Sequence, residues 1–198
     1  KIEFLYQYHQ RHGRSLGDRL VAWLPRYAPL ASRFGALLNL RKPGGLLARL
    51  GEKVLGLSAG RSLPRWRERF DDLEQPEFDA ATDAGEVVLL VDTFNRYFEA
   101  ENARAARAVL AAAGYRVRLP RASDGNRPLC CGRSFLASGM VDEARHEARR
   151  MLEALRPFIE RGTPIIGLEP SCLLTLRDEY LSMLPGEETR ALAAQALL

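Results

Sequence analysis

Hydrophobic side chains recur at helical spacing through the first part of the chain. The clearest helix is predicted after Ser15, which with Asp18 resembles a capping box ahead of an apolar stripe. Pro25 and Pro29 are expected to break this stripe, and further short apolar stripes follow. We therefore predict an all-helical segment over residues 1–75, which packs on other parts of a larger protein.

An acidic stretch separates this helical segment from the rest of the chain. Between residues 64 and 85, Asp and Glu side chains are interspersed with Pro76 and small residues. This composition is typical of a solvated linker. We place the domain boundary inside the stretch and take residues 76–85 as the linker.

Residues 86–198 alternate between strand-like and helix-like patterns. The predicted strands are 87–91, 115–119 and 164–168. The predicted helices are 98–113, a long helix through 141–155 that Pro157 should kink or split, and a last helix capped by Ser171. This order predicts an α/β domain with a small parallel sheet and crossover helices.

Composition narrows the function classes only slightly. Of 198 residues, 46% are hydrophobic, which allows a sizeable core, and 29 Lys and Arg against 25 Asp and Glu give a net charge of +4. Such a mild excess, spread along the chain, argues against nucleic-acid binding. No apolar stretch is long enough for a transmembrane segment. The Arg-rich amphipathic helices leave a peripheral association with a membrane open.

Two further features bear on context. The chain begins at Lys1 inside a predicted helix, and we expect it to be a fragment of a longer protein. Its three cysteines, two of them adjacent, make a poor disulfide framework and fit a reducing compartment. We therefore expect a cytoplasmic protein, with the inner face of the membrane as an alternative location.

The candidate chemistry lies at the carboxyl ends of the predicted strands, where parallel sheets place their sites. Asp92 follows the first strand, Cys130 and Cys131 follow the second, and Cys172 follows the third. All three cysteines are thus predicted to converge on one edge of the sheet.

Each of these positions suits a redox or metal role. Cys172 falls in the first turn of a helix, which favours a thiolate, and Gly132 allows a tight turn after the cysteine pair. Thiolates select iron–sulfur clusters or zinc. The alternatives remain open, since cysteines are often small buried hydrophobes and Asp92 is equally suited to cap the next helix.

Other candidates are weaker. His9, His12 and His146 fall on predicted helix surfaces away from the strand ends, where solvated side chains are expected. The sequence contains no phosphate-cradling glycine loop, dinucleotide fingerprint or zinc-protease motif.

Three segments resemble the cysteine-rich (CCG) domain of iron–sulfur oxidoreductases. They are VDTFNRYFEAENARAARAVLAAAGYRV, RPLCCGRSFLASGMVDEAR and GTPIIGLEPSCLLTLRDEYLSMLPG, within residues 86–190. The most similar group is the FAD-linked dehydrogenases of D-lactate, D-2-hydroxyglutarate and glycolate whose C-terminal half is an iron–sulfur oxidoreductase. The resemblance covers the first CCG repeat and the helical segment before it.

The sequence departs from the family pattern at two places. Asp92 starts the segment where a full repeat has a cysteine, and Cys172 is followed by Leu173 rather than opening a C-x-x-C pair. Three sulfurs are too few for a four-ligand cluster. The resemblance implies that the second CCG repeat and the flavin domain lie elsewhere in the protein or in subunits of its complex.

The resemblance implies an electron-transfer module. FAD in the missing upstream domain would oxidise a D-2-hydroxy acid, and an iron–sulfur cluster would pass the electrons to an acceptor. Cys130, Cys131 and Cys172 would be cluster ligands or would line the acceptor site, and Asp92 would supply an oxygen ligand in place of the usual cysteine. We expect the fragment alone to lack an intact cluster and to be inactive; zinc held by the three thiolates and Asp92 is the alternative. A non-catalytic docking module with a vestigial cysteine site is the second hypothesis.

Overall fold

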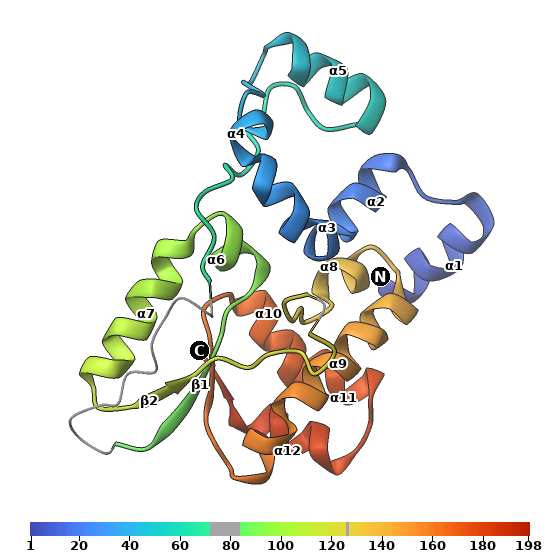
Figure 1. The fold of residues 1–198 in the computed structure, drawn as a ribbon. Coiled ribbons are helices and arrows are strands. Elements are labelled where there is room, and N and C mark those ends of the chain that lie inside the picture. The colour runs from blue at the N-terminus through green and yellow to red at the C-terminus, as the bar shows by residue number, and fades with distance from the viewer. Residues whose placement is uncertain (72–83, 126) are drawn as a thin grey trace.

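The computed structural model describes residues 1–71, 84–125 and 127–198. Its centre is a parallel four-stranded sheet with strand order β2-β1-β3-β4 (Figure 1). The strands are β1 (Glu86–Leu90), β2 (Arg116–Arg118), β3 (Ile165–Gly167) and β4 (Ala196–Leu197). The predicted α/β class with a small parallel sheet is confirmed.

Helices cover both faces of the sheet. Because successive strand side chains point to opposite faces, Val87 and Leu89 pack towards α7, while Val88 and Leu90 pack towards α9 and the C-terminal helices. The helices of this part are α6 (Thr93–Tyr97), α7 (Ala100–Ala112), α8 (Arg133–Ala137), α9 (Val141–Glu160), α10 (Pro170–Leu174), the π-helix η2 (Thr175–Glu179), α11 (Tyr180–Met183) and α12 (Glu187–Gln195).

The N-terminal segment forms a helical arm. It comprises α1 (Ile2–His12), α2 (Leu16–Ala22), α3 (Leu24–Ala31), the 3-10 helix η1 (Ser32–Phe34), α4 (Gly35–Leu38) and α5 (Leu46–Leu55). Ser15 caps α2 by accepting a hydrogen bond from the Asp18 N–H. Part of the arm packs on the α/β domain, where α2 contacts α8 and Ser134 Oγ donates to the Ala22 carbonyl.

Residues 64–71 differ from the expected solvated linker. Phe70 is buried against the sheet face that also carries Leu89, and its N–H donates to the Arg96 carbonyl. The sequence pattern did not indicate this burial, because a single aromatic side chain among charged neighbours forms no periodic apolar pattern. Burial of Phe70 nevertheless removes a large apolar surface from water. Of the predicted linker 76–85, only residues 84 and 85 fall within the described part of the chain.

Proline interrupts the helices less than expected. Pro25 stands in the first turn of α3, where its missing N–H costs nothing, and Pro29 lies inside the same helix. Pro157 does not split α9, which runs without interruption from Val141 to Glu160. Burial of the apolar face of α9 compensates for the one backbone hydrogen bond that Pro157 cannot donate.

In the C-terminal part, one local prediction was wrong and one strand was missed. The helix α10 is capped by Glu169, whose side chain accepts from the Ser171 N–H, because Pro170 occupies the first helical position. The fourth strand, β4, was not predicted, since two residues are too short to show an alternating pattern. It forms by pairing with the edge of β3.

The arm exposes many large apolar side chains. Figure 1 shows α4 and α5 standing away from the sheet. Between residues 30 and 54, the exposed large apolar residues are Leu30, Phe34, Leu37, Leu38, Leu40, Leu46, Leu47, Leu50 and Val54. Among the described residues, no helix combines the length and the apolar character that crossing a membrane requires.

The sheet, rather than the arm, should carry the stability of the chain. Leu89 is 0% exposed in the central strand, so Leu89→Ala should lower the free energy of unfolding by about 2–5 kcal/mol. Leu46 is 83% exposed, and Leu46→Ala should change it by less than about 0.5 kcal/mol. Urea denaturation followed by circular dichroism measures both; equal effects would contradict this assignment of the core.

Candidate functional site

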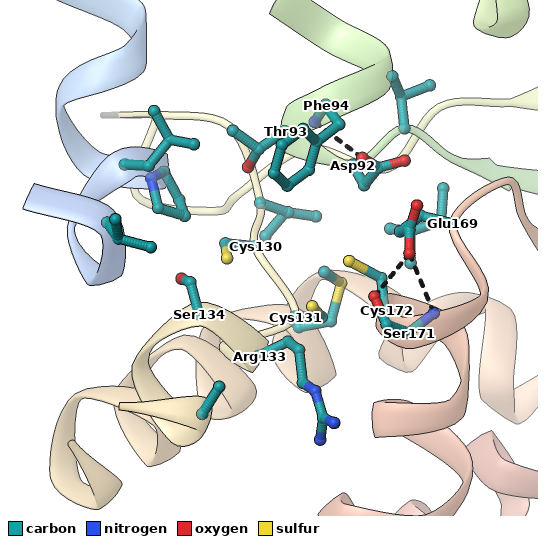
Figure 2. A pocket seen from close by; sticks show the side chains of 18 residues that line it. Asp92, Thr93, Phe94, Cys130, Cys131, Arg133, Ser134, Glu169, Ser171 and Cys172 are labelled. Atoms are coloured by element: carbon teal, nitrogen blue, oxygen red, sulfur yellow. Dashed lines mark hydrogen bonds between the residues drawn. The ribbon is translucent and has the colours of Figure 1, made fainter. Parts of the chain in front are cut away.

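Three loops meet at the carboxyl ends of the strands. One loop follows β1, one follows β3, and one is the end of the long connection between β2 and α8. Together with α2, α3 and α8, these loops enclose a mostly apolar cavity of about 240 Å³ (Figure 2). The lining includes Asp92, Cys130, Cys131 and Cys172, so the convergence predicted from the sequence is confirmed. The remaining walls come mainly from Val21, Leu24, Pro25, Leu90, Val91, Phe94, Leu129 and Met151.

The three thiols form a contiguous group in this cavity. All three cysteines are free; Cys130 and Cys131 are buried, and Cys172 is half-buried. The Cys131 side chain interacts with those of both Cys130 and Cys172. Figure 2 shows the Cys130 and Cys131 side chains on one loop and Cys172 on the first turn of α10.

The backbone after the cysteine pair is held in one conformation. Gly132 has φ +83°, and an added Cβ would lie 2.9 Å from the Ala144 carbonyl oxygen. Only glycine fits this left-handed turn at such a close approach. The Gly132 N–H donates to Cys130 Sγ at 3.3 Å, and the buried Tyr180 hydroxyl donates to the Cys131 carbonyl at 3.0 Å. The expected tight turn is therefore present.

Contacts between the thiols, together with burial, keep the cysteine pair protonated. The hydrogen bond with Cys131 and then burial raise the pKa of the Cys130 thiol well above its usual value. For Cys131, the contact with Cys130 lowers the pKa, but the contact with Cys172 and burial outweigh it and raise the pKa. Both groups are thiols at neutral pH, so binding of a metal would release their protons.

Asp92 is occupied as a helix cap. Its Oδ1 accepts from the backbone N–H groups of Phe94 (2.8 Å) and Asn95 (3.2 Å), and its Oδ2 accepts from Asn95 Nδ2 at 2.5 Å. The capping role that the sequence left open is thus observed. Its role as a metal ligand stays a prediction.

The described residues contain no preformed site for a single metal ion. Within the described ranges, no three His, Cys, Asp or Glu side chains are grouped so that they could hold one metal ion. A preformed tetrahedral zinc site is therefore not observed there. Three soft sulfur donors that line one cavity are compatible with a polynuclear centre that receives further ligands from elsewhere.

The histidines lie outside this cavity. His9 and His12 are on α1, where their Nδ1 atoms contact the carbonyl oxygens of Gly13 and Tyr8, and His146 is exposed on α9. None of the three is among the described residues that line the cysteine cavity.

Several residues around the site were not predicted. Arg133, beside Cys131, pairs with Glu179 of the π-helix η2, and Glu147 is buried behind the cysteine loop. The sequence pattern could have indicated that Glu147 is buried, because this residue falls on the apolar face of α9 with Ala144 and Met151. A charged residue on such a face is informative, since burial of a charge requires partners.

Similarity to known proteins is limited to sequence. A D-2-hydroxyglutarate dehydrogenase of Escherichia coli is 29% identical over 199 residues, covering 95% of this chain and 19% of that protein. The one of Pseudomonas putida is 27% identical over 198 residues, with 95% and 19% covered. A subunit of the anaerobic glycerol-3-phosphate dehydrogenase of Escherichia coli is 38% identical over 56 residues, with 28% and 14% covered.

The dehydrogenase names of these relatives support an oxidoreductase function. The chain spans about a fifth of the length of the D-2-hydroxyglutarate dehydrogenases that it matches. No protein-family model and no solved structure matches the chain.

The three thiols should differ in reactivity. Under native conditions at neutral pH, iodoacetamide should alkylate the half-buried Cys172 before Cys130 and Cys131, which are 7% and 4% exposed and protonated. The thiolate is the nucleophile, and its fraction grows as the pH rises. As long as the pH is below the pKa of the buried pair, each added pH unit should therefore accelerate alkylation of Cys130 and Cys131 by up to about tenfold. Peptide mass spectrometry measures the order, and similar rates for all three in the folded protein would contradict it.

Proposed function

We propose that this chain is an electron-transfer module of an oxidoreductase in which Cys130, Cys131 and Cys172 supply part of the ligand set of an iron–sulfur cluster. The observation that carries the proposal is the gathering of three thiols from two distant loops in one apolar cavity. Thiolate is the ligand that such clusters require. The dehydrogenase names of the relatives support a redox role.

In the whole protein, we place the module after a flavin. An FAD domain elsewhere in the protein would oxidise a D-2-hydroxy acid, in keeping with the relatives named D-2-hydroxyglutarate dehydrogenase. A second CCG repeat or another subunit would complete the ligand set. We assign the protein to the cytoplasm, where free thiols stay reduced.

The residues of this chain prepare the cavity for such a group. An iron–sulfur cluster supplies one-electron transfer when bound. Cys130 and Cys131 would give up their protons to bind iron, and the Gly132 N–H would donate to the Cys130 sulfur, which is a contact that tunes cluster potentials. Leu90, Leu129 and their apolar neighbours would exclude water from the sulfurs.

Metal analysis tests this proposal. The protein with its flanking regions should be purified anaerobically and reconstituted with iron and sulfide. We expect stoichiometric iron, acid-labile sulfide and a broad visible absorption. Cys131→Ser should lose most of the absorption and of the iron, because it removes the central thiol of the three.

The matched control is Met151→Leu, which changes a buried residue of the same cavity without removing a thiol. It should keep the iron content and absorption. Unchanged iron and turnover in Cys131→Ser would refute the cluster role. Stoichiometric zinc in place of iron would do the same.

A second candidate function is a non-catalytic docking module. The observation that favours it is the exposed apolar surface of α4 and α5, with Leu46, Leu47, Leu50 and Val54 turned to solvent. Patches of this kind mark interaction sites. In this alternative the arm binds the rest of the oxidoreductase and the cysteines have no role in turnover.

Hydrogen exchange distinguishes a docked arm from a free one. The α5 amides should exchange rapidly in the 198-residue chain and become protected by about tenfold or more in the longer protein, because a contact buries them. The double variant Leu46→Asp, Leu50→Asp should abolish this protection. Val109→Asp, at an exposed apolar position on α7, is the control and should retain it.

Equal exchange in both proteins would refute docking of the arm. Sedimentation of the chain with anionic vesicles, lost in the same double variant, would assign the apolar surface to a membrane instead.

A further inference from the structure

A fully buried carboxylate lies behind the cysteine cavity. Glu147 on α9 is 0% exposed, and both of its oxygens accept hydrogen bonds from arginines. Oε1 accepts from Arg26 Nε at 3.0 Å and from Arg127 Nη2 at 2.6 Å. Oε2 accepts from Arg127 Nη1 at 2.7 Å and from Arg150 Nη1 at 3.2 Å. One carboxylate thus binds three arginines.

The three arginines come from different parts of the molecule. Arg127 lies three residues before Cys130 on the cysteine loop, and Arg26 lies on α3 next to the cavity-lining Pro25. Arg150 belongs to α9 itself. Glu147 is therefore the point at which α9 holds both the cysteine loop and the arm wall of the cavity.

Additional contacts extend the network. Arg150 forms two hydrogen bonds with Asp124, at 2.8 and 2.9 Å, and donates to the Arg127 carbonyl at 3.0 Å. The Arg26 guanidinium lies over the rings of Trp23 and Phe135, 4.5 and 4.7 Å from their centroids. The cysteine loop is consequently fixed through side chains and through its backbone.

The charge at Glu147 is maintained in spite of its burial. Burial alone would raise the pKa of Glu147, but the hydrogen bonds and charges of Arg127 and Arg26 outweigh it, and the pKa is lowered. A buried ion pair adds less stability than an apolar contact of similar volume, whereas removing one partner is strongly destabilising. Such a network is best explained by the single arrangement that it specifies.

We propose that Glu147 is the positioning residue of the cysteine cavity: through Arg127 it sets the place of Cys130 and Cys131, and through Arg26 it sets the arm wall opposite them. The importance of these positions for a cluster rests on the proposed function. The positions themselves can be tested on the protein without any metal.

The test follows the alkylation rate of each cysteine by mass spectrometry. Glu147→Gln removes the charge but keeps the shape, and it should accelerate reaction of Cys130 and Cys131 by about tenfold, because local opening controls access to buried groups. Reaction of Cys172, on α10, should stay unchanged. Glu147→Asp keeps the charge and should restore most of the protection.

The matched control is Glu86→Gln. Glu86 is a second carboxylate that pairs with two arginines, Arg118 and Arg161, at the opposite end of β1. Its loss should leave all three alkylation rates unchanged. Equal acceleration of all three cysteines in Glu147→Gln and Glu86→Gln would show general loosening and overturn the proposal.

Two single arginine variants separate the branches and remain informative if Glu147→Gln fails to fold. Arg127→Met should accelerate alkylation of Cys130 and Cys131. Arg26→Met should accelerate it by a smaller factor, because it frees the arm wall opposite the pair while the loop keeps its other contacts. No change in Arg127→Met would overturn the proposal. Normal iron content in Cys131→Ser would refute the cluster role of the cysteines. If Arg127→Met still accelerated alkylation of Cys130 and Cys131, the positioning role of Glu147 would be retained.

Discussion

The parallel pairing of β1 with β2 and β3 is the constraint on which the rest of the structure depends. Parallel strands require crossover connections, and these carry α7 and α9 to opposite faces of the sheet. The same pairing places the carboxyl ends of the strands at one edge. Cysteines separated by about forty positions in the chain therefore meet in one cavity, although no local feature of either loop encodes the contact.

Apolar burial and ionic contacts have different roles around this cavity. The sheet is stabilised by fully buried apolar side chains such as Leu89 and Ile165, which act without directional preference. The loop that carries the cysteines has few such residues and is held by directional contacts from Tyr180, Arg127 and Gly132. Hydrogen bonds and ion pairs are suited to this purpose, because they specify an arrangement more strictly than apolar contact does.

The cavity and the arm have different parts in the proposed function. The cavity holds the protonated thiols of Cys130 and Cys131 inside an apolar wall, and a metal that bound them would replace their protons. The arm offers an apolar surface that this chain leaves uncovered in the described residues. An electron-transfer site needs both water exclusion and a neighbouring redox group, and these two features meet those needs in the proposed function.

Sequence patterns alone predicted the fold class, the three main strands and the meeting of the cysteines, because continuous apolar runs and helical stripes report burial directly. They also predicted the turn at Gly132 and gave capping as one of two roles for Asp92, since both depend on near neighbours in the chain.

Only the tertiary structure decided the remaining features. The strand β4, the core position of Phe70 and the cap at Glu169 depend on partners or on local competition that periodicity does not report. The network around Glu147 joins residues more than a hundred positions apart. A buried charge becomes intelligible only when its partners are known, because the same glutamate without arginines would be neutral or excluded from the core.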